Sequence, residues 1–123
     1  IALLPDGGRE PATSQQLAVA LAEHTGCAVV LTLGAAGSVV ATSAGMVAVP
    51  PIKVDHVEDT TGAGDAFTAA LAVALVEVPD LHRAARFATA AGAHAVTIRE
   101  VVPSLPNRDQ VTDLVRRYDK EFV

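Results

Sequence analysis

Cysteine, aromatic residues and long apolar runs are all scarce in this sequence. The single cysteine, Cys27, has no partner for an internal disulfide, which favours a reducing compartment, and we expect a cytoplasmic protein. No apolar run approaches the ~20 residues that cross a bilayer, so a membrane is not an expected partner. Nucleic acid is not expected either, because 9 basic against 14 acidic residues give a net charge of −5 and no long basic run is present.

Apolar residues, by contrast, make up 50% of the 123 residues, which is enough for the core of one domain. Small apolar residues at helical spacing, with a capping residue in front, predict helices in three places. A fourth helix is predicted where the chain is apolar on every side, which is typical of a fully buried helix. These helices are expected over residues 14–25, 66–76, 80–96 and from Asn107 onward. Thr13 or Ser14 is expected to cap the first helix and Gly26 to end it, and Asn107 with Gln110 predicts a capping box at the start of the last.

Short runs rich in β-branched residues predict the strands. Residues 27–33 have the uniformly apolar character of a strand buried in a parallel sheet, and Cys27 is expected to be buried at its start. Residues 38–41 and 46–49 are expected to form a hairpin, and residues 52–57 a further strand. Strands that alternate with helices predict an α/β fold in which helices pack over a sheet.

The densest chemical signal is the run Asp59-Thr-Thr-Gly-Ala-Gly-Asp-Ala-Phe67. Its glycines let backbone amides converge on one point, and the start of a helix adds partial positive charge, so the segment suits an anion. Asp65 does not fit plain anion binding, because a carboxylate repels an anion. It does fit as the acceptor of a proton from a hydroxyl that attacks a bound phosphate, so the run predicts phosphoryl transfer to an alcohol.

Other interpretations of this run are weaker or remain open. No glycine is followed by lysine, which excludes a Walker loop, and Phe67 stands where a dinucleotide fingerprint needs Gly or Ala. Asp65 could instead be a helix-start residue in a catalytically inactive nucleotide-binding or oligomerisation fragment. An acidic protein-interaction module would bind no ATP. A metal role for His56 or Glu58 is a minor alternative.

The run DTTGAGDAF resembles the C-terminal signature of the ribokinase-like, phosphofructokinase B-type carbohydrate kinases. Thr32-Leu-Gly-Ala-Ala-Gly37 resembles that family's nucleotide loop. Arg86–Thr97, followed by Pro103–Pro106, is similar to the helix and loop beside the adenine, most closely in the ribokinase branch. The resemblance implies a three-layer α/β/α ribokinase-like fold. It also implies that residues 1–123 are the C-terminal nucleotide-binding and catalytic portion, with the N-terminal sugar-binding and lid half absent.

The activity that this resemblance implies is ATP-dependent phosphoryl transfer to a sugar hydroxyl. Ribose is the favoured acceptor, while fructose, a keto-deoxy sugar acid or a nucleoside stays open. Asp65 would be the catalytic base and contact the sugar, and Gly62 with the amides of Ala63, Gly64 and Asp65 would form the anion hole. The residues implied at the ATP site are Thr32, Leu33, Gly34, Ala35, Ala36, Gly37, Gly64, Asp65 and, near the adenine, Thr89.

Further expectations concern cofactors and partners, and these too come from the resemblance. Mg²⁺ would bridge the phosphates of ATP, the full-length enzyme would be a homodimer, and the isolated chain would be a poor catalyst. A potassium-like ion would lie behind the anion hole, among hard oxygen ligands. The residues implied around that ion are Asp59, Thr61, Ala95, Ile98, Glu100 and Ser104.

Overall fold

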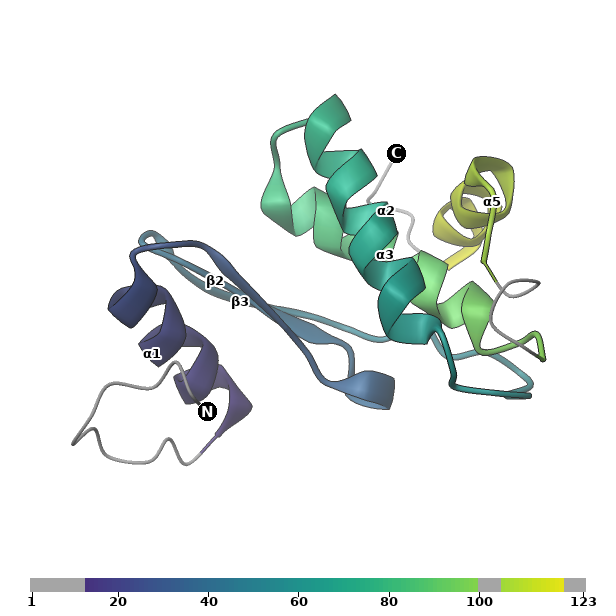
Figure 1. Ribbon diagram of the computed structural model, residues 1–123, viewed down its shortest axis with the longest axis horizontal. Helices are drawn as coiled ribbons and strands as arrows, with labels where there is room; N and C mark the ends of the chain where they lie inside the picture. Colours follow the sequence, from purple (N-terminus) through teal and green to yellow (C-terminus); the bar gives the residue numbers. More distant parts are fainter. Residues whose placement is uncertain (1–12, 100–104, 119–123) are drawn as a thin grey trace. The chain divides into compact units, whose positions relative to one another are not determined.

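The computed structural model describes residues 13–99 and 105–118, which fall into two compact units, 1–50 and 51–123. Each unit is described by itself. Within the described residues, the first unit contains one α-helix and three strands, and the second contains three α-helices (Figure 1). None of the described helices has the length and apolar character needed to cross a membrane.

The first unit begins with helix α1, Ser14–Thr25, at the position that the sequence predicts. Its start is capped by Thr13, whose hydroxyl accepts a hydrogen bond from the amide of Gln16 at 3.1 Å. Its end is Gly26, which adopts a left-handed conformation with φ of 69°. Both ends of this helix are therefore determined by residues within or next to it.

The sheet of the first unit has three strands in the order β1-β2-β3: Val29–Thr32, Ser38–Thr42 and Gly45–Val49. Both pairings are antiparallel, because each strand is joined to the next by a short turn that reverses the chain. The hairpin of the second and third strands is confirmed. The expectation of a parallel neighbour for the first strand is wrong within the described residues. The register brings three valines side by side: Val30, Val40 and Val47.

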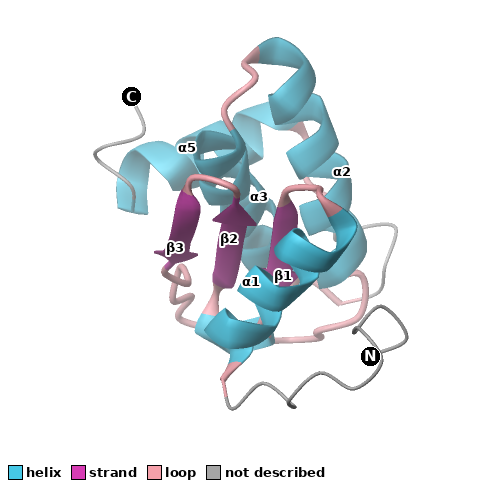
Figure 2. Ribbon diagram, turned by 90° about the vertical axis from the view of Figure 1, so that its left-hand side faces the viewer, coloured by secondary structure: helices cyan, strands magenta, loops and turns pink. Residues whose placement is uncertain are grey.

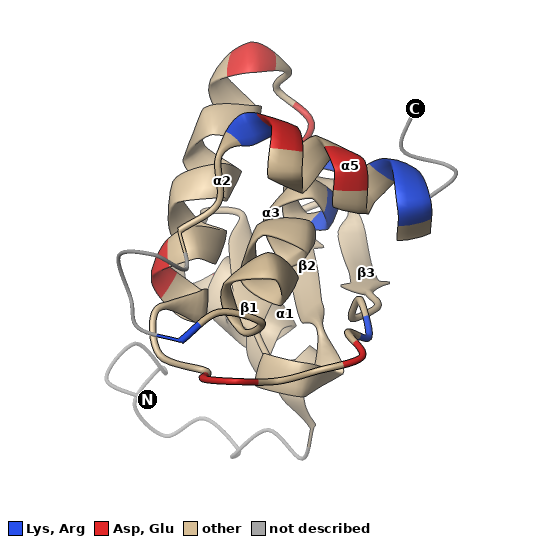
Figure 3. Ribbon diagram, turned by 90° about the vertical axis from the view of Figure 1, so that its right-hand side faces the viewer, with Lys and Arg blue, Asp and Glu red and all other residues tan. Residues whose placement is uncertain are grey.

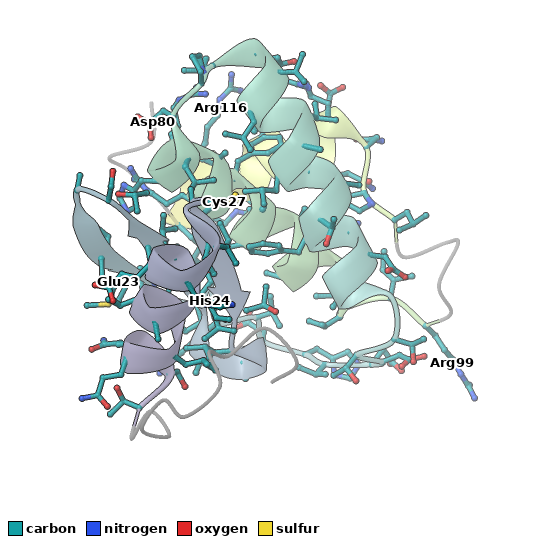
Figure 4. The ribbon with its side chains drawn as sticks, turned by 60° about the vertical axis from the view of Figure 1, so that its left-hand side comes forward. Glu23, His24, Cys27, Asp80, Arg99 and Arg116 are labelled. Carbon is teal, nitrogen blue, oxygen red and sulfur yellow. The ribbon has the colours of Figure 1, made fainter. Side chains whose placement is uncertain are left out.

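Helix α1 covers one face of this sheet (Figure 2). Ala18 and Ala22 of the helix form a buried cluster with Val39 and Ala41 of β2. Cys27 does not join this core. It lies in the bend that follows Gly26, ahead of the first strand residue, and is exposed (Figure 4). The expectation that Cys27 is buried is therefore wrong.

The second unit begins with an irregular segment where a strand over residues 52–57 was expected. That expectation is wrong. Pro50 and Pro51 remove two backbone donors from its start, and no strand pairs with the segment among the described residues. From this segment, Ile52 packs against the apolar core of the unit.

Three helices form the body of the second unit: α2 (Ala63–Glu77), α3 (Leu81–Ala95) and α5 (Arg108–Tyr118). Helix α3 lies between the other two and contacts both. Small side chains dominate the shared core, so the helices approach closely. That core consists of Ala74, Ala84, Phe87, Ala90, Ala91, Val111 and Val115.

Helix α2 is less enclosed than its sequence predicts. It carries charge only near its two ends (Figure 3). Nevertheless, Val73 is 48% exposed and Val76 is 88% exposed, so the expectation of burial on all sides is wrong for this chain. One face of the helix packs against α3, whereas Val73 and Val76 remain exposed.

Local hydrogen bonds determine where the other two helices begin. The carboxylate of Asp80 (labelled in Figure 4) accepts the amide of Arg83 at 2.9 Å and caps α3. Asn107 and Gln110 form a reciprocal capping box ahead of α5, with both bonds at 2.9 Å. Both starts agree with the sequence-based expectation.

Candidate active site

The run that carries the chemical signal forms the entry to helix α2. Gly62 is the N-cap and has φ of 84°, a left-handed conformation that side-chain-bearing residues rarely adopt. The helix starts directly after it, and the first helical bond runs from the amide of Ala66 to the carbonyl of Gly62 at 2.9 Å. The chain therefore turns sharply at Gly62, and the next amides all belong to the open end of a helix.

Two of the amides at this helix end have no acceptor within the part of the chain that the structure describes. The amide of Ala63 donates a long hydrogen bond of 3.3 Å to the carbonyl of Thr60. Those of Gly64 and Asp65 find no hydrogen-bond acceptor among the described residues. Unpaired amides at a helix start, together with the helix dipole, attract an anion. Of the three amides expected in the anion hole, two are thus available and one is engaged.

The carboxylate of Asp65 projects from the first turn of the same helix. Its residue is exposed, and no hydrogen bond or ion pair within the described part of the chain occupies its oxygens. Because no cap or ion pair occupies the carboxylate, it is available to accept a proton from a ligand bound at the helix end.

The segment before the turn is fastened to the end of helix α3. The carbonyl of Val96 accepts the amides of Glu58 at 2.8 Å and Asp59 at 3.3 Å. The carboxylate of Asp59 accepts the amide of Thr61 at 2.9 Å, which forms an Asx-turn. The position of the turn thus depends on a residue far along the chain, and the sequence analysis missed Val96 because a carbonyl acceptor carries no side-chain signal.

The candidate cation ligands lie partly in this region. Asp59 and Thr61 are joined by the Asx-turn, and the carbonyl of Ala95 accepts the amide of Ile98 at 3.4 Å, a long contact. Glu100 and Ser104 lie outside the described residues. Hydrogen bonds join Asp59 to Thr61 and Ala95 to Ile98, and the bond from the amide of Asp59 to the carbonyl of Val96 links the first pair to the end of α3.

His94 adds no positive charge near this turn. Burial lowers its pKa below the ordinary value, and its Nε2 atom is enclosed without a hydrogen-bond partner in the described structure. A histidine in that setting stays neutral at neutral pH. The polar character of this end of α3 therefore comes from backbone carbonyls rather than from a side-chain charge.

The minor metal hypothesis gains no support from side-chain clustering. His56 Nε2 and Glu58 Oε1 lie 2.6 Å apart on the exposed segment before the turn. Across residues 13–99 and 105–118, no group of three or more His, Cys, Asp or Glu side chains is placed to hold an ion. The pair is explained by a surface hydrogen bond alone.

The candidate nucleotide loop lies in the first unit, between β1 and β2. Gly34–Ala36 form a single 3₁₀ turn, which is closed by a bond from the amide of Leu33 to the carbonyl of Gly37 at 2.8 Å. Gly34 and Gly37 have φ of 57° and 93°. Gly34, Ala35, Ala36 and Thr32 are all exposed. The loop is a compact structure that presents backbone to solvent.

Thr89, expected near the adenine, lies on helix α3 of the second unit. It is half-buried, and its hydroxyl donates a 2.8 Å hydrogen bond to the carbonyl of Ala85 in the same helix. The hydroxyl oxygen keeps its capacity to accept a hydrogen bond from a ligand.

The chain matches the model of one protein family, described as pfkB family carbohydrate kinase, over residues 6–108. It is similar to a ribokinase of Arabidopsis thaliana, with 46% identity over 65 residues that cover 53% of this chain and 17% of that protein. It is also similar to fructokinase-1 of Zea mays, with 42% identity over 77 residues, 57% of this chain and 24% of that protein.

Among solved structures, Arabidopsis thaliana ribokinase complexed with ribose and ATP is similar to this chain. The TM-score is 0.77 at 36% sequence identity, over 85% of this chain and 35% of the solved chain. The fold is therefore ribokinase-like, as expected from the sequence. The chain spans about a third of the solved chain and a smaller share of the two curated relatives.

Proposed function

Because the chain belongs to the pfkB family of carbohydrate kinases, we propose that it provides the catalytic and nucleotide-binding portion of an enzyme that transfers a phosphoryl group from ATP to a sugar hydroxyl. The observation that carries the proposal is the open start of helix α2. There, the unoccupied carboxylate of Asp65 follows directly on the two unpaired amides of Gly64 and Asp65. Anion-binding donors and a proton acceptor on one helical turn suit this reaction.

The proposed step follows from the properties of these groups. Asp65 accepts the proton of the sugar hydroxyl, whose oxygen forms a bond to the γ-phosphorus of ATP. The bond between that phosphorus and the bridging oxygen breaks, and ADP leaves. The amides of Gly64 and Asp65 donate to the phosphoryl oxygens as charge develops on them, while the amide of Ala63 joins them only if its long bond to Thr60 opens.

The proposal also assigns residues to ATP. Thr32–Gly37 would line the nucleotide, which is supported by the exposed backbone and left-handed glycines of that loop. Thr89 would lie near the adenine. Mg²⁺ would enter bound to the ATP phosphates and neutralise part of their charge.

A potassium-like ion is a further part of the proposal. Asp59 and Thr61, with the carbonyls of Ala95 and Ile98, supply the hard oxygens that such an ion prefers. Each of these oxygens that already accepts one hydrogen bond retains a second lone pair, so the donor chemistry fits.

The favoured acceptor is ribose, which is supported by the similarity to ribokinases and by the ribose and ATP in the solved Arabidopsis complex. The similarity to a fructokinase keeps fructose as the second candidate. The proposed setting is the cytoplasm, supported by a single exposed cysteine, and the proposed assembly is a homodimer of the whole enzyme.

The test is Asp65→Asn in the complete gene product that contains these residues. We expect kcat for the best sugar to fall by about 10²–10⁴, the usual contribution of a general base, while the Kd for ATP stays within about threefold. Turnover is followed as ADP release with ribose, fructose and nucleosides, and ATP binding is followed by calorimetry.

Asp80→Asn is a matched control for this test. It makes the same chemical change at the start of helix α3, where Asn caps as well as Asp, so kcat should not change. Unchanged turnover in Asp65→Asn would show that another group is the base. If the wild-type protein binds ATP but phosphorylates no sugar, the inactive nucleotide-binding interpretation replaces the kinase.

A further inference from the structure

We propose that Gly92 is a positioning residue for phosphoryl transfer. The small size of this residue lets α3 lie against the turn that starts α2, and this contact holds the amides of Gly64 and Asp65 in place. The inference rests on the proposed function, because those amides matter for turnover only if they bind the transferred group.

A side chain at position 92 would touch helix α2 from its first carbon atom onward. A Cβ atom built on Gly92 would lie 3.4 Å from the carbonyl oxygen of Ala63 and 3.9 Å from Cβ of Phe67. Both distances are ordinary van der Waals contact, so a methyl group fits at this position, and it would touch the backbone of the turn. Ala63 is the first residue of α2, and its atom in this contact is backbone rather than the end of a flexible side chain.

The end of α3 that follows Gly92 also holds the segment that leads into the turn at Gly62. Val96 accepts the amides of Glu58 and Asp59, and its own amide donates to the carbonyl of Gly92 at 3.3 Å. The segment from residue 58 to Ala63 is thus fastened upstream by Val96 and supported downstream by Gly92. One short stretch of α3 therefore determines where the turn at Gly62 lies.

Glycine is an unfavourable residue inside a helix, and α3 is otherwise rich in alanine, the best helix former. Since a Cβ at this position would already touch the turn, the requirement we infer is for a side chain no larger than that of alanine. Catalytic donors must hold their position closely, since a displacement of about 1 Å can lower a rate by about 10². The requirement at Gly92 is thus tied to the site rather than to the helix.

The test is a size series at Gly92 in the complete gene product: Gly92→Ala, Gly92→Ser and Gly92→Val. Val adds two methyl groups beyond Cβ and has one strongly preferred rotamer in a helix, so it is the largest and least adaptable residue of the series. We expect Gly92→Val to lower kcat by about 10² with the KM for ATP changed less than about threefold, because the turn moves while the nucleotide loop does not. Gly92→Ala should retain most of kcat, and Gly92→Ser should fall between them.

His82→Val is the matched control, because it adds the same β-branched residue to α3 about 15 Å along the axis from Gly92. Its kcat should equal that of the wild type. Circular dichroism establishes that each variant is folded. If Gly92→Val does not fold, the comparison of Gly92→Ser with Gly92→Ala decides. The inference is overturned if the largest folded variant keeps wild-type kcat, or if His82→Val or Gly92→Ala loses as much.

Amide NMR separates failure of this inference from failure of the proposed function. The resonances of Gly62 and Gly64 should shift in Gly92→Val and stay in place in His82→Val, whether or not the protein phosphorylates a sugar. A wild-type protein without kinase activity removes the proposed function and with it the catalytic role of Gly92. An active protein whose Gly62 and Gly64 resonances do not respond to Gly92→Val overturns the positioning role alone.

Discussion

The two units of this chain each contain an exposed, glycine-bearing turn, and the two turns are held in different ways. The turn between β1 and β2 closes on itself, with the amides of Leu33, Ala36 and Gly37 bonded to carbonyls three or four positions away. The turn before α2 is held by the carbonyl of Val96, from another helix. The first is a local structure, and the second depends on tertiary packing.

This difference indicates how each turn responds to change. A closed local turn tolerates alterations elsewhere in the fold, because all its bonds come from its own residues. A turn fastened to a distant helix moves whenever that helix moves. We therefore expect nucleotide affinity to respond to substitutions within residues 32–37, and turnover to respond to substitutions on α3 as well as within the turn.

Within this comparison of the two turns, the largest effects should come from placing alanine at Gly62 and at Gly37. Gly62 and Gly37 have φ of 84° and 93°, where a side chain is strained, so each substitution distorts its own turn. We expect Gly62→Ala to lower kcat by about 10², the scale for loss of one anion-hole donor. Gly37→Ala should instead raise the KM for ATP by about tenfold, the equivalent of about 1.4 kcal/mol. Steady-state kinetics with ATP and sugar varied separately measures both.

Gly26→Ala is the control for backbone strain. Gly26 has φ of 69° at the end of α1, outside both turns, and its substitution should lower stability without changing kcat or KM. The roles assigned to the two turns would be contradicted if Gly62→Ala changed only the KM for ATP and Gly37→Ala changed only kcat. These roles would be supported if Gly62→Ala altered only kcat and Gly37→Ala altered only the KM for ATP.

Intermediate effects are expected from the helix caps of the two units. Thr13 caps α1 through one hydroxyl bond, whereas Asn107 and Gln110 cap α5 through two reciprocal bonds. Thr13→Ala should destabilise α1 by about 1 kcal/mol, and Asn107→Ala should destabilise α5 by as much or more. Amide hydrogen exchange in each helix measures this, with Asp113→Ala on the exposed face of α5 as the control. A larger loss in α1 than in α5 would contradict this ranking.

The smallest effect should come from the ion pair between α2 and α5. Arg108 donates two hydrogen bonds to the carboxylate of Glu77, one of them 2.9 Å long, and lies over the ring of Phe87 at 5.6 Å. The hydrogen bond from Arg108 lowers the pKa of Glu77 below its ordinary value. The pair therefore stabilises the fold above the unfolded-state pKa of Glu77, and that contribution disappears as the pH falls through the lower folded-state value.

Glu77→Gln should remove this pH dependence with little loss of stability, because the pair is exposed and screened by salt. Denaturant unfolding of both proteins across the acidic range, at low and at high salt, measures the difference. A gap between the two proteins that grows as the pH falls would contradict the assigned sign.

Residues with local roles were the ones that the sequence predicted well. Thr13, Gly26 and the Asn107–Gln110 pair bond to neighbours within a few positions, and the structure confirms each. The strand over residues 52–57 was wrong because a strand needs a partner, which the segment lacks in the described structure. Cys27 was expected to be buried because the strand was predicted to start at residue 27, two residues before its observed start. The exposure of Val76 was missed because it depends on what packs beside α2.

The sequence by itself determined the helix caps, the hairpin and the family of this chain. All of these follow from residues that act on close neighbours or from a contiguous motif. Only the tertiary structure revealed that Val96 holds the turn before Gly62 and that Gly92 leaves space for the carbonyl of Ala63. The reason is physical: a backbone carbonyl and an absent side chain leave no trace in the residue pattern until packing brings them beside their partners.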